Sequence, residues 1–384
     1  MNVVSSETIA KPNWTVIREE FPTTADCVYL NIANKAILPR RVELSMQSWM
    51  ADIYNNAGRE AFSMNGIETA REAVSQTFGA PRDCLALIKN TSEGINIVAQ
   101  GFPWKQGDNV VISEFEHENN TFPWRHLVRR GIEVRLAEPA PDGRVTINQY
   151  RKLIDKRTRI LAVGWVVYGN GFRTDLEALS GFCQENGIKL IVDGIQAVGV
   201  LATPIADTGA DVLIAGGHKA QFSLAGAGIM YAKQDMIKML IPPYAAKFSF
   251  VSLDRTLPVP ELTNDAHRFE YGNPNFLGCW VQRHSAEYLR AITLANIEAR
   301  VRELTTYLID EADKYKIKIR SPRPWEQRAG IVSLDLGCHA GKVVQKLNER
   351  KVIVSEKDGH LRTSLHFYNN EEDIDRFYLE LRAA

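Results

Sequence analysis

Cysteine is scarce in this 384-residue chain, and its five cysteines are scattered. They are Cys27, Cys84, Cys183, Cys279 and Cys338, an odd number without a C-x-x-C pair. This pattern argues against a disulfide framework and against a zinc site built from thiolates, so we predict no metal site. It fits a reducing compartment best, and the expected location is the cytoplasm.

Long apolar runs and an excess of one charge are also missing. No run approaches the roughly 20 apolar residues of a membrane-spanning helix, and the first twenty residues lack the apolar core of a secretory signal. Because 46 Lys and Arg balance 46 Asp and Glu, nothing draws the whole chain to nucleic acid or to an anionic membrane. We expect neither as a partner, and any bound anion must be held locally.

The composition is that of an ordinary globular protein. Hydrophobic residues make up 45% and charged residues 24%, which argues against disordered and fibrous classes. The chain is too long for one typical domain, and it contains no internal repeat. Two packed domains are therefore expected.

Seven short apolar runs alternate with amphipathic segments between residues 84 and 231. The runs are CLALI, NVVIS, IEVRL, RILAVGWVV, KLIVD, DVLIA and GIMYA. Runs of this length predict strands buried on both faces, and the alternation is typical of a doubly wound α/β sheet. One connecting helix is indicated by Leu176, Leu179 and Cys183, which share a helical face after the acidic Asp175.

After about Pro258 the pattern changes to that of a smaller α+β domain. We expect a helix over 296–315, a strand in GIVSLDLG, a helix over GKVVQKLNERK, a strand in HLRTSLHFY and a final helix from NNEEDIDRF. Asn369, followed three residues later by Glu372, is a capping signal for the last helix.

Lys219 stands in an unusual place for a lysine. It follows a predicted buried strand within IAGGHKAQFSLAGAG, amid small residues, which puts its amine in a crevice at the carboxyl edge of the sheet. Desolvation there would supply a neutral amine able to form a Schiff base. The alternative is an ordinary solvated lysine on a glycine loop.

Asp193 ends the strand KLIVD and faces the same edge of the sheet. A buried carboxylate there could keep a pyridinium nitrogen protonated, and Gln196 could donate to a phenolic oxygen of the same ring. Asp193 could instead cap the following turn.

Two further motifs follow predicted strands. In NTSEGIN, Thr91 and Ser92 offer hydroxyls, and Gly94 offers unobstructed backbone, at a helix N-terminus, where phosphate binds readily. A plain helix cap is the alternative. In EFEHENNTFPW, His117 could stack on a flat ring, although it could also be an ordinary surface histidine.

The order of these motifs resembles the fold-type-I pyridoxal-phosphate (PLP) enzymes, specifically the class V aminotransferase and cysteine desulfurase superfamily. The resemblance runs from YLNIANKAILP to RTSLHFYNNEEDID, and IVDGIQAVGVL followed by GGHKA is its most specific part. It implies PLP as cofactor, a large PLP-binding domain over 36–265 with a mostly parallel seven-stranded sheet, a small C-terminal α+β domain over 266–384, and an N-terminal segment over 1–35 that packs on the small domain.

The resemblance also implies residue roles. Lys219 would hold the cofactor covalently, and Asp193 would pair with the ring nitrogen. The remaining cofactor contacts would come from Thr91, Ser92, His117, Gln196, His218 and Asn273. Substrate would be bound by Arg362, through its carboxylate, and by Asn34. RFEYGNPN at 268–275 resembles the segment that reaches the partner subunit's phosphate, which implies a homodimer with shared active sites.

The stretch before Arg362 departs from the desulfurase pattern. It reads KVIVSEKDGHLR and lacks the mobile nucleophilic cysteine that desulfurases need there, while Cys338 lies earlier. Asn273 and Tyr168 replace the Thr and Asn of many relatives. The chain thus resembles more the isopenicillin-N-epimerase-like and cysteine-conjugate lyase branch.

We therefore favour C–S β-elimination from a cysteine-derived amino acid. An aminotransferase or an amino-acid epimerase is the alternative, and a cysteine desulfurase is less favoured. A nucleotide-binding oxidoreductase is disfavoured because no G-x-G-x-x-G follows an early strand. A binding protein without activity on this scaffold stays open.

Overall fold

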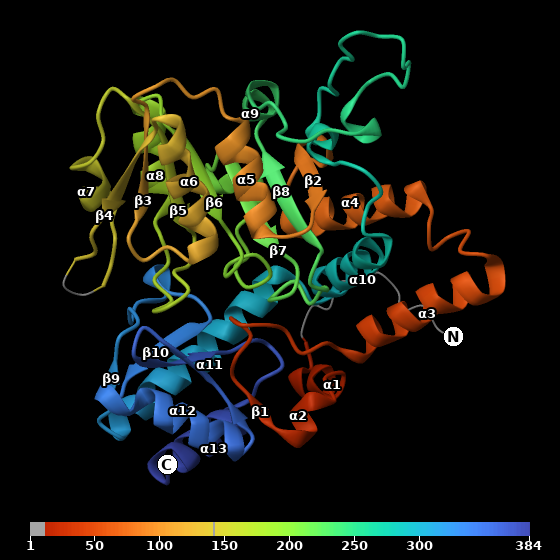
Figure 1. The fold of residues 1–384 in the computed structure, drawn as a ribbon. Helices are drawn as coiled ribbons and strands as arrows, with labels where there is room; N and C mark the ends of the chain where they lie inside the picture. Colours follow the sequence, from red (N-terminus) through yellow and green to blue (C-terminus); the bar gives the residue numbers. More distant parts are fainter. Residues whose placement is uncertain (1–11, 141–142) are drawn as a thin grey trace.

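A large sheet with helices on both faces lies beside a smaller sheet in the computed structural model (Figure 1), which describes residues 12–140 and 143–384. In spatial order the strands of the large sheet are β2 (Leu85–Ile88), β8 (Gly228–Ala232), β7 (Val212–Gly216), β6 (Lys189–Asp193), β5 (Thr158–Gly164), β3 (Asn109–Ser113) and β4 (Glu133–Ala137). Only β8 runs antiparallel to its neighbours. The predicted seven-stranded, mostly parallel sheet is confirmed.

Alternating strand residues build two apolar layers on the faces of this sheet. Val110 and Ile112 of β3 pack on one side, in the same cluster as Ile95 and Val98. Val111 packs on the other side, in the cluster that holds Leu179 and its helix. Both faces of the inner strands are therefore buried, as their continuous apolar runs predict, whereas the edge strand β4 is only partly buried, with Glu133 exposed.

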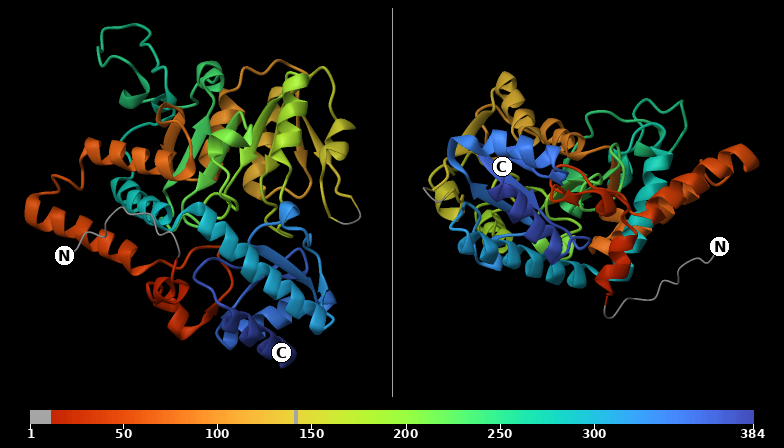
Figure 2. Two further views of the ribbon diagram at one scale, coloured as in Figure 1. Left: turned by 180° about the vertical axis from the view of Figure 1, so that it is seen from behind. Right: turned by 90° about the horizontal axis from the view of Figure 1, so that it is seen from below.

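The α-helices around the large sheet follow the predicted alternation from β2 to β6, whereas only a 3₁₀ turn (Ile205–Thr208) separates β6 from β7 and no helix separates β7 from β8. They are α3 (Arg40–Asn56), α4 (Met64–Phe78), α5 (Thr91–Gly101), α6 (Phe122–His126), α7 (Ile147–Arg151), α8 (Leu176–Glu185), α9 (Gln234–Met239) and α10 (Phe276–Ile292). Asp175 caps α8 by accepting a hydrogen bond from the Ala178 amide at 3.0 Å. α3 projects from the body of the molecule, as Figure 2 shows, and α10 packs against α3 and α4.

The smaller sheet is four-stranded and antiparallel, in the order β12 (Ser355–Lys357), β13 (His360–Ser364), β10 (Ile331–Asp335) and β9 (Lys318–Ile319). Its helices are α11 (Leu294–Lys314), α12 (Ala340–Glu349) and α13 (Glu371–Arg382). They enclose a separate apolar cluster that includes Leu304, Val332 and Phe377. This part has the predicted α+β character.

The chain before residue 35 packs against this smaller part. It forms α1 (Trp14–Glu19), α2 (Thr23–Asp26) and β1 (Val28–Tyr29), and β1 pairs in parallel with β11 (Val352–Ile353). Arg18 also forms an ion pair with Asp373 at 2.8 Å. The predicted segment 1–35 begins outside the described residues, and the domain boundaries at 36 and 266 stay predictions.

The predicted cap of the last helix was wrong by one residue. Asn370, not Asn369, caps α13, and its partner in the capping box is Asp373 rather than Glu372. The Asn369 amide instead donates to the Tyr29 carbonyl at 3.1 Å and to Asp373 at 2.9 Å. The Asn369 side chain, which the local pattern predicts to be the cap, therefore makes a long-range contact with β1 instead.

Among the described residues, no helix combines the length and the apolar character needed to cross a membrane. The cytoplasmic location stays a prediction.

Candidate active site

A cavity of about 210 Å³ lies where the parallel strands of the large sheet end. Gly164 closes β5 and Asp193 closes β6, and both line it, as Lys219 does just beyond β7. The cavity also brings together Asn34, Thr91, His117, Gln196 and His218 of the predicted site. Crevices at the carboxyl ends of such strands are the usual ligand sites of α/β sheets.

Lys219 is buried, with 9% of its surface exposed. Burial lowers the pKa of its amine to about 8, because the charged form loses its hydration, while the nearby negative charge of Asp193 opposes the shift. The loop before it is tightly packed, since a Cβ on Gly217 would come within 2.8 Å of the Ala227 carbonyl oxygen. A substantial fraction of this amine is therefore neutral near pH 8.

Asp193 is buried beside it, with 8% of its surface exposed. Oδ1 accepts a hydrogen bond from the Ile195 amide at 3.0 Å, and the described residues offer Oδ2 no hydrogen-bond partner. Burial raises the pKa of the carboxyl to about 6, against the effects of this hydrogen bond and of Lys219. An aromatic N–H in the cavity would satisfy the free oxygen and favour the charged form.

The N-terminus of α5 reaches the cavity through Thr91. Asn90 caps the helix by accepting from the Glu93 amide at 2.9 Å, and Thr91 Oγ1 accepts from the Gly216 amide at 3.2 Å. Gly94 packs against the sheet, because a Cβ there would lie 2.6 Å from Ile214 Cγ2. Its role is thus close helix–sheet packing, not the exposed backbone expected, and Ser92 does not line the cavity.

The aromatic ring of His117 stands edge-on to that of Tyr168, with centroids 5.1 Å apart and an interplanar angle of 77°. Its Nδ1 accepts from the Asn119 amide at 3.1 Å, and burial lowers its pKa. Gln196 lines the same cavity, but its amide donates to the Ala33 carbonyl at 3.0 Å. Both side chains are thus oriented by protein contacts.

Arg362 does not itself line the cavity but contacts Tyr168, which does, and only 2% of its surface is exposed. Its guanidinium donates to the Tyr168 carbonyl at 2.8 Å and to Ser355 Oγ at 3.0 Å. Burial lowers its pKa to about 10. Within the described chain no carboxylate forms an ion pair with it, so the guanidinium can accept an external one.

The model of the family described as "Aminotransferase class-V" matches residues 28–377, nearly the whole chain. The chain belongs to this family. It is 27% identical over 383 residues to a probable cysteine desulfurase of Pyrococcus abyssi, covering 94% of this chain and 95% of that protein.

Two solved structures share the fold of this chain. The apo structure of a cysteine desulfurase from Thermococcus onnurineus has a TM-score of 0.87 at 24% identity, covering 98% of this chain and 100% of that one. The cystine C–S lyase C-DES, in complex with its product cysteine persulfide, has a TM-score of 0.86 at 20% identity, covering 94% and 98%. The fold type predicted from the sequence is confirmed.

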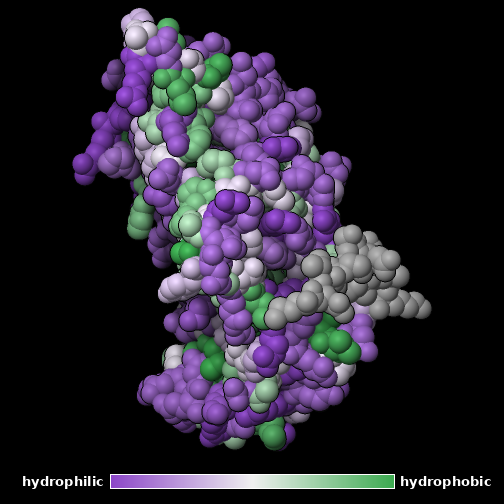
Figure 3. All heavy atoms as spheres, turned by 90° about the vertical axis from the view of Figure 1, so that its right-hand side faces the viewer, coloured by the Kyte–Doolittle hydropathy of each residue, from purple (hydrophilic) through white to green (hydrophobic). Residues whose placement is uncertain are grey.

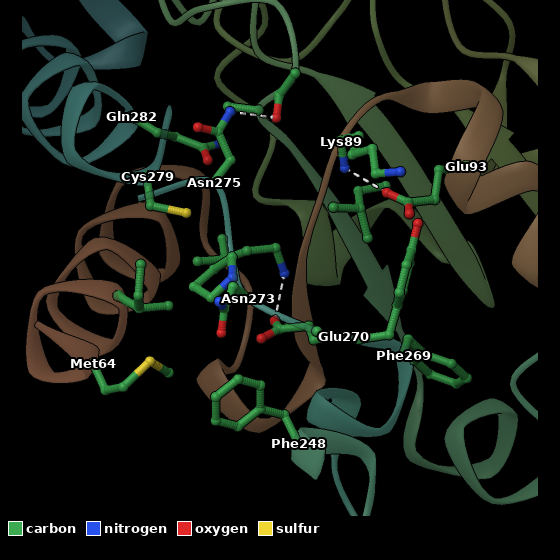
Figure 4. Close-up of a pocket in the computed structure, with 18 residues that line it drawn as sticks. Met64, Lys89, Glu93, Phe248, Phe269, Glu270, Asn273, Asn275, Cys279 and Gln282 are labelled. Atoms are coloured by element: carbon green, nitrogen blue, oxygen red, sulfur yellow. Dashed lines mark hydrogen bonds between the residues drawn. The ribbon is translucent and has the colours of Figure 1, made fainter. Parts of the chain in front are cut away.

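Asn273 does not line the cavity that contains Lys219. It lines a second cavity of about 540 Å³ with Lys89, Glu270 and Asn275 (Figure 4). Asn275 donates there to the Gly226 carbonyl at 2.8 Å. The predicted contact between Asn273 and the cofactor therefore stays a prediction.

Sequence reasoning missed Glu116, which lines the cavity directly before His117. Its carboxylate accepts from the Gly164 amide and from the Asn120 amide, both at 2.8 Å, and Asn120 in turn accepts from Trp124 Nε1 at 3.1 Å. Burial raises the pKa of Glu116 to about 7. Its position directly before His117 in EFEHENN could have indicated it. Among the described residues no group of His, Cys, Asp and Glu is arranged to hold a metal ion.

Proposed function

We propose that this protein uses PLP to break a C–S bond in a cysteine-derived amino acid by β-elimination. When bound, PLP supplies an aromatic ring that withdraws electrons from Cα of the amino acid. The cavity fits it in its chemistry: a buried amine, a buried carboxylate with a free oxygen, and a helix N-terminus with Thr91 lie together.

Each residue of the site has a separate role in this proposal. Lys219 Nζ holds the cofactor and then, as a neutral amine, takes the Cα proton. Asp193 keeps the ring nitrogen protonated, and His117 covers the ring. Thr91 and His218, with the N-terminus of α5, hold the phosphate. Arg362 binds the substrate α-carboxylate and fixes Cα near Lys219.

We favour β-elimination over desulfuration because no thiol lines the site. None of the five cysteines, all of which lie in the described chain, lines the cavity. The segment before Arg362 forms β12, which turns directly into β13 because Lys357 pairs with His360. Asp358 and Gly359 between them have φ of 51° and 78°, typical of a two-residue hairpin turn. No loop remains there to carry a mobile nucleophile.

The reaction consumes one water and needs no oxidant. The Cα–H bond breaks to give its proton to Lys219, and the Cβ–S bond breaks with its electron pair leaving on sulfur. Hydrolysis then yields pyruvate and ammonia beside the free thiol. Incubating the purified protein with S-substituted cysteines and measuring pyruvate, ammonia, keto acid, alanine and D-isomer together tests this proposal against transamination, epimerisation and desulfuration.

A desulfurase is the second candidate, because the Pyrococcus relative carries that name. Cys338 is its potential nucleophile: it is exposed beyond the end of β10, with Sγ 3.7 Å from His339 Nε2. Residue 333 of β10 lies opposite Arg362, and Cys338 lies five residues beyond residue 333 in the sequence. An exposed thiol there lacks the cationic, half-enclosed setting of an activated cysteine.

Replacing Cys338 with serine is expected to leave pyruvate release from S-substituted cysteines within about twofold of wild type, since surface substitutions away from the site have small effects. Alanine production from free cysteine should be negligible in both proteins. The measurement is alanine and pyruvate quantified in parallel. Robust alanine formation that disappears in Cys338→Ser would identify a desulfurase instead.

Replacing Arg362 with alanine is expected to lower kcat/KM by about 10²-fold, mainly through KM, because a bidentate charged hydrogen bond contributes roughly 1.5–3 kcal/mol. Arg362→Lys should recover only part of this loss, since a point charge lacks the fork geometry. Steady-state kinetics with an S-substituted cysteine measure both variants. Unchanged KM in Arg362→Ala would remove this residue from the substrate site.

The homodimer belongs to the same proposal. Asn273 lies outside the cavity of Lys219, and α3 exposes Leu44, Met50 and Tyr54. Figure 3 views the molecule from the side on which α3 projects and shows apolar patches among the hydrophilic surface. Apolar patches of this kind commonly mark protein interfaces. A solution mass of twice the chain mass supports the dimer, and a monomer that turns over substrate argues against shared sites.

A further inference from the structure

The turn between β12 and β13 brings a second cation toward the cavity. Ser355 lies opposite Arg362 in the hairpin and accepts its Nε hydrogen bond. Because side chains alternate along a strand, Lys357 lies on the same face of β12 as Ser355. On this face Arg362 donates to the carbonyl of Tyr168, which lines the cavity.

The tip of the hairpin rests on the loop that lines the cavity. A Cβ on Gly169 would come within 2.6 Å of Asp358 Oδ2, and Gly169 directly follows Tyr168, which lines the cavity. The positive charge of Lys357 acts on two residues at the site: after the larger effect of burial, it contributes to the lowered pKa of both His117 and Lys219. The contact at Gly169 and the electrostatic effect of Lys357 thus both indicate that the tip of the hairpin lies near the cavity.

The structure leaves the Lys357 ammonium without an ion pair among the described residues. The acid Asp335, at the edge of the same sheet, faces His360 at 3.8 Å and Lys318 at 3.1 Å instead. Asp358 is turned toward Gly169 and Tyr168. Lys357 and Arg362 are thus two cations on one face of the hairpin that form no ion pair with a carboxylate of the described residues, although the charge of Asp358 acts on Arg362.

We infer that Lys357 selects substrates whose sulfur substituent carries a second negative charge, such as a distal carboxylate. This rests on the proposed function: because Lys357 and Arg362 lie on the same face of the hairpin, a substrate held by its α-carboxylate at Arg362 would have a second anion on its sulfur substituent attracted by Lys357. The substrate class is then a cysteine conjugate whose sulfur substituent ends in a carboxylate.

Two nearly isosteric substrates test this inference. S-(carboxymethyl)cysteine has a negative group on sulfur, and S-(carbamoylmethyl)cysteine has a neutral amide in its place. Comparing kcat/KM for both substrates in wild type and in Lys357→Met cancels their intrinsic difference in leaving-group reactivity. Lys342→Met, at an exposed lysine of α12, is the matched control.

Lys357→Met should lower kcat/KM for the carboxylate substrate by about fivefold to tenfold, the size expected for one partly solvated charge pair. The value for the amide should change by less than about twofold, and 0.5 M salt should shrink the preference in wild type. Lys342→Met should behave as wild type.

The outcomes separate the two hypotheses. Pyruvate from both substrates, with equal effects of Lys357→Met on both or none on either, overturns the role of Lys357 and leaves β-elimination standing. No pyruvate from either substrate in wild type overturns the proposed function and this inference with it.

Discussion

Lys219→Ala is expected to lower pyruvate release from S-substituted cysteines by about 10³-fold or more, because one side chain supplies both the covalent attachment and the Cα base. PLP should still bind, held by the N-terminus of α5 and by Asp193, but reversibly. Dialysis should remove it from the variant and not from wild type.

Borohydride reduction followed by peptide mapping gives the direct measurement. A pyridoxyl label should appear on Lys219 in wild type and on no peptide of Lys219→Ala. Because burial lowers the pKa of this lysine to about 8, reattachment of PLP to the stripped protein should accelerate as pH rises through that value. Lys238→Ala, at an exposed lysine of α9, is the control. A label on another lysine would contradict the assignment.

Asp193→Ala is expected to lower kcat by about 10²-fold or more while cofactor content falls much less. The phosphate contacts supply much of the binding, whereas a fixed carboxylate at the ring nitrogen acts mainly in the transition state. Asp193→Asn keeps an oxygen for the Ile195 amide, so it separates loss of charge from disturbance of the turn.

The measurement is turnover per bound PLP, with PLP content determined after alkaline release. Asp193→Asn should be as slow as Asp193→Ala if the negative charge is what matters. Proportional losses of PLP and rate in both variants, with normal turnover per bound PLP, would reduce Asp193 to a binding residue.

The sequence predicted those parts of the site that depend on where strands end. Asp193 and Lys219 follow strands whose apolar runs are unbroken, and parallel strands bring their carboxyl ends to one edge. The same argument placed Thr91 and His117 at the cavity. Position along the chain was enough because the sheet itself gathers these residues.

Contacts between distant segments could not be predicted in this way. The bond from the Gly164 amide to Glu116 spans 48 residues, and the bond from Arg362 to Tyr168 spans 194. In both pairs, the sequence around one residue gives no indication of its partner. The hairpin, in contrast, could have been predicted from the sequence, because an Asp-Gly pair such as Asp358–Gly359 indicates a two-residue turn. This turn would have predicted that Lys357 lies near Arg362.

The short turn at Asp358–Gly359 also has a consequence for the time course of the reaction. An enzyme that stores sulfur on its own thiol shows a burst of one equivalent and then waits for a reductant or an acceptor protein. In the proposed β-elimination the leaving sulfur is not transferred to a thiol of the protein, so product should accumulate linearly from the first turnover. The rate should be independent of added dithiothreitol, and no second protein should be needed to unload the enzyme.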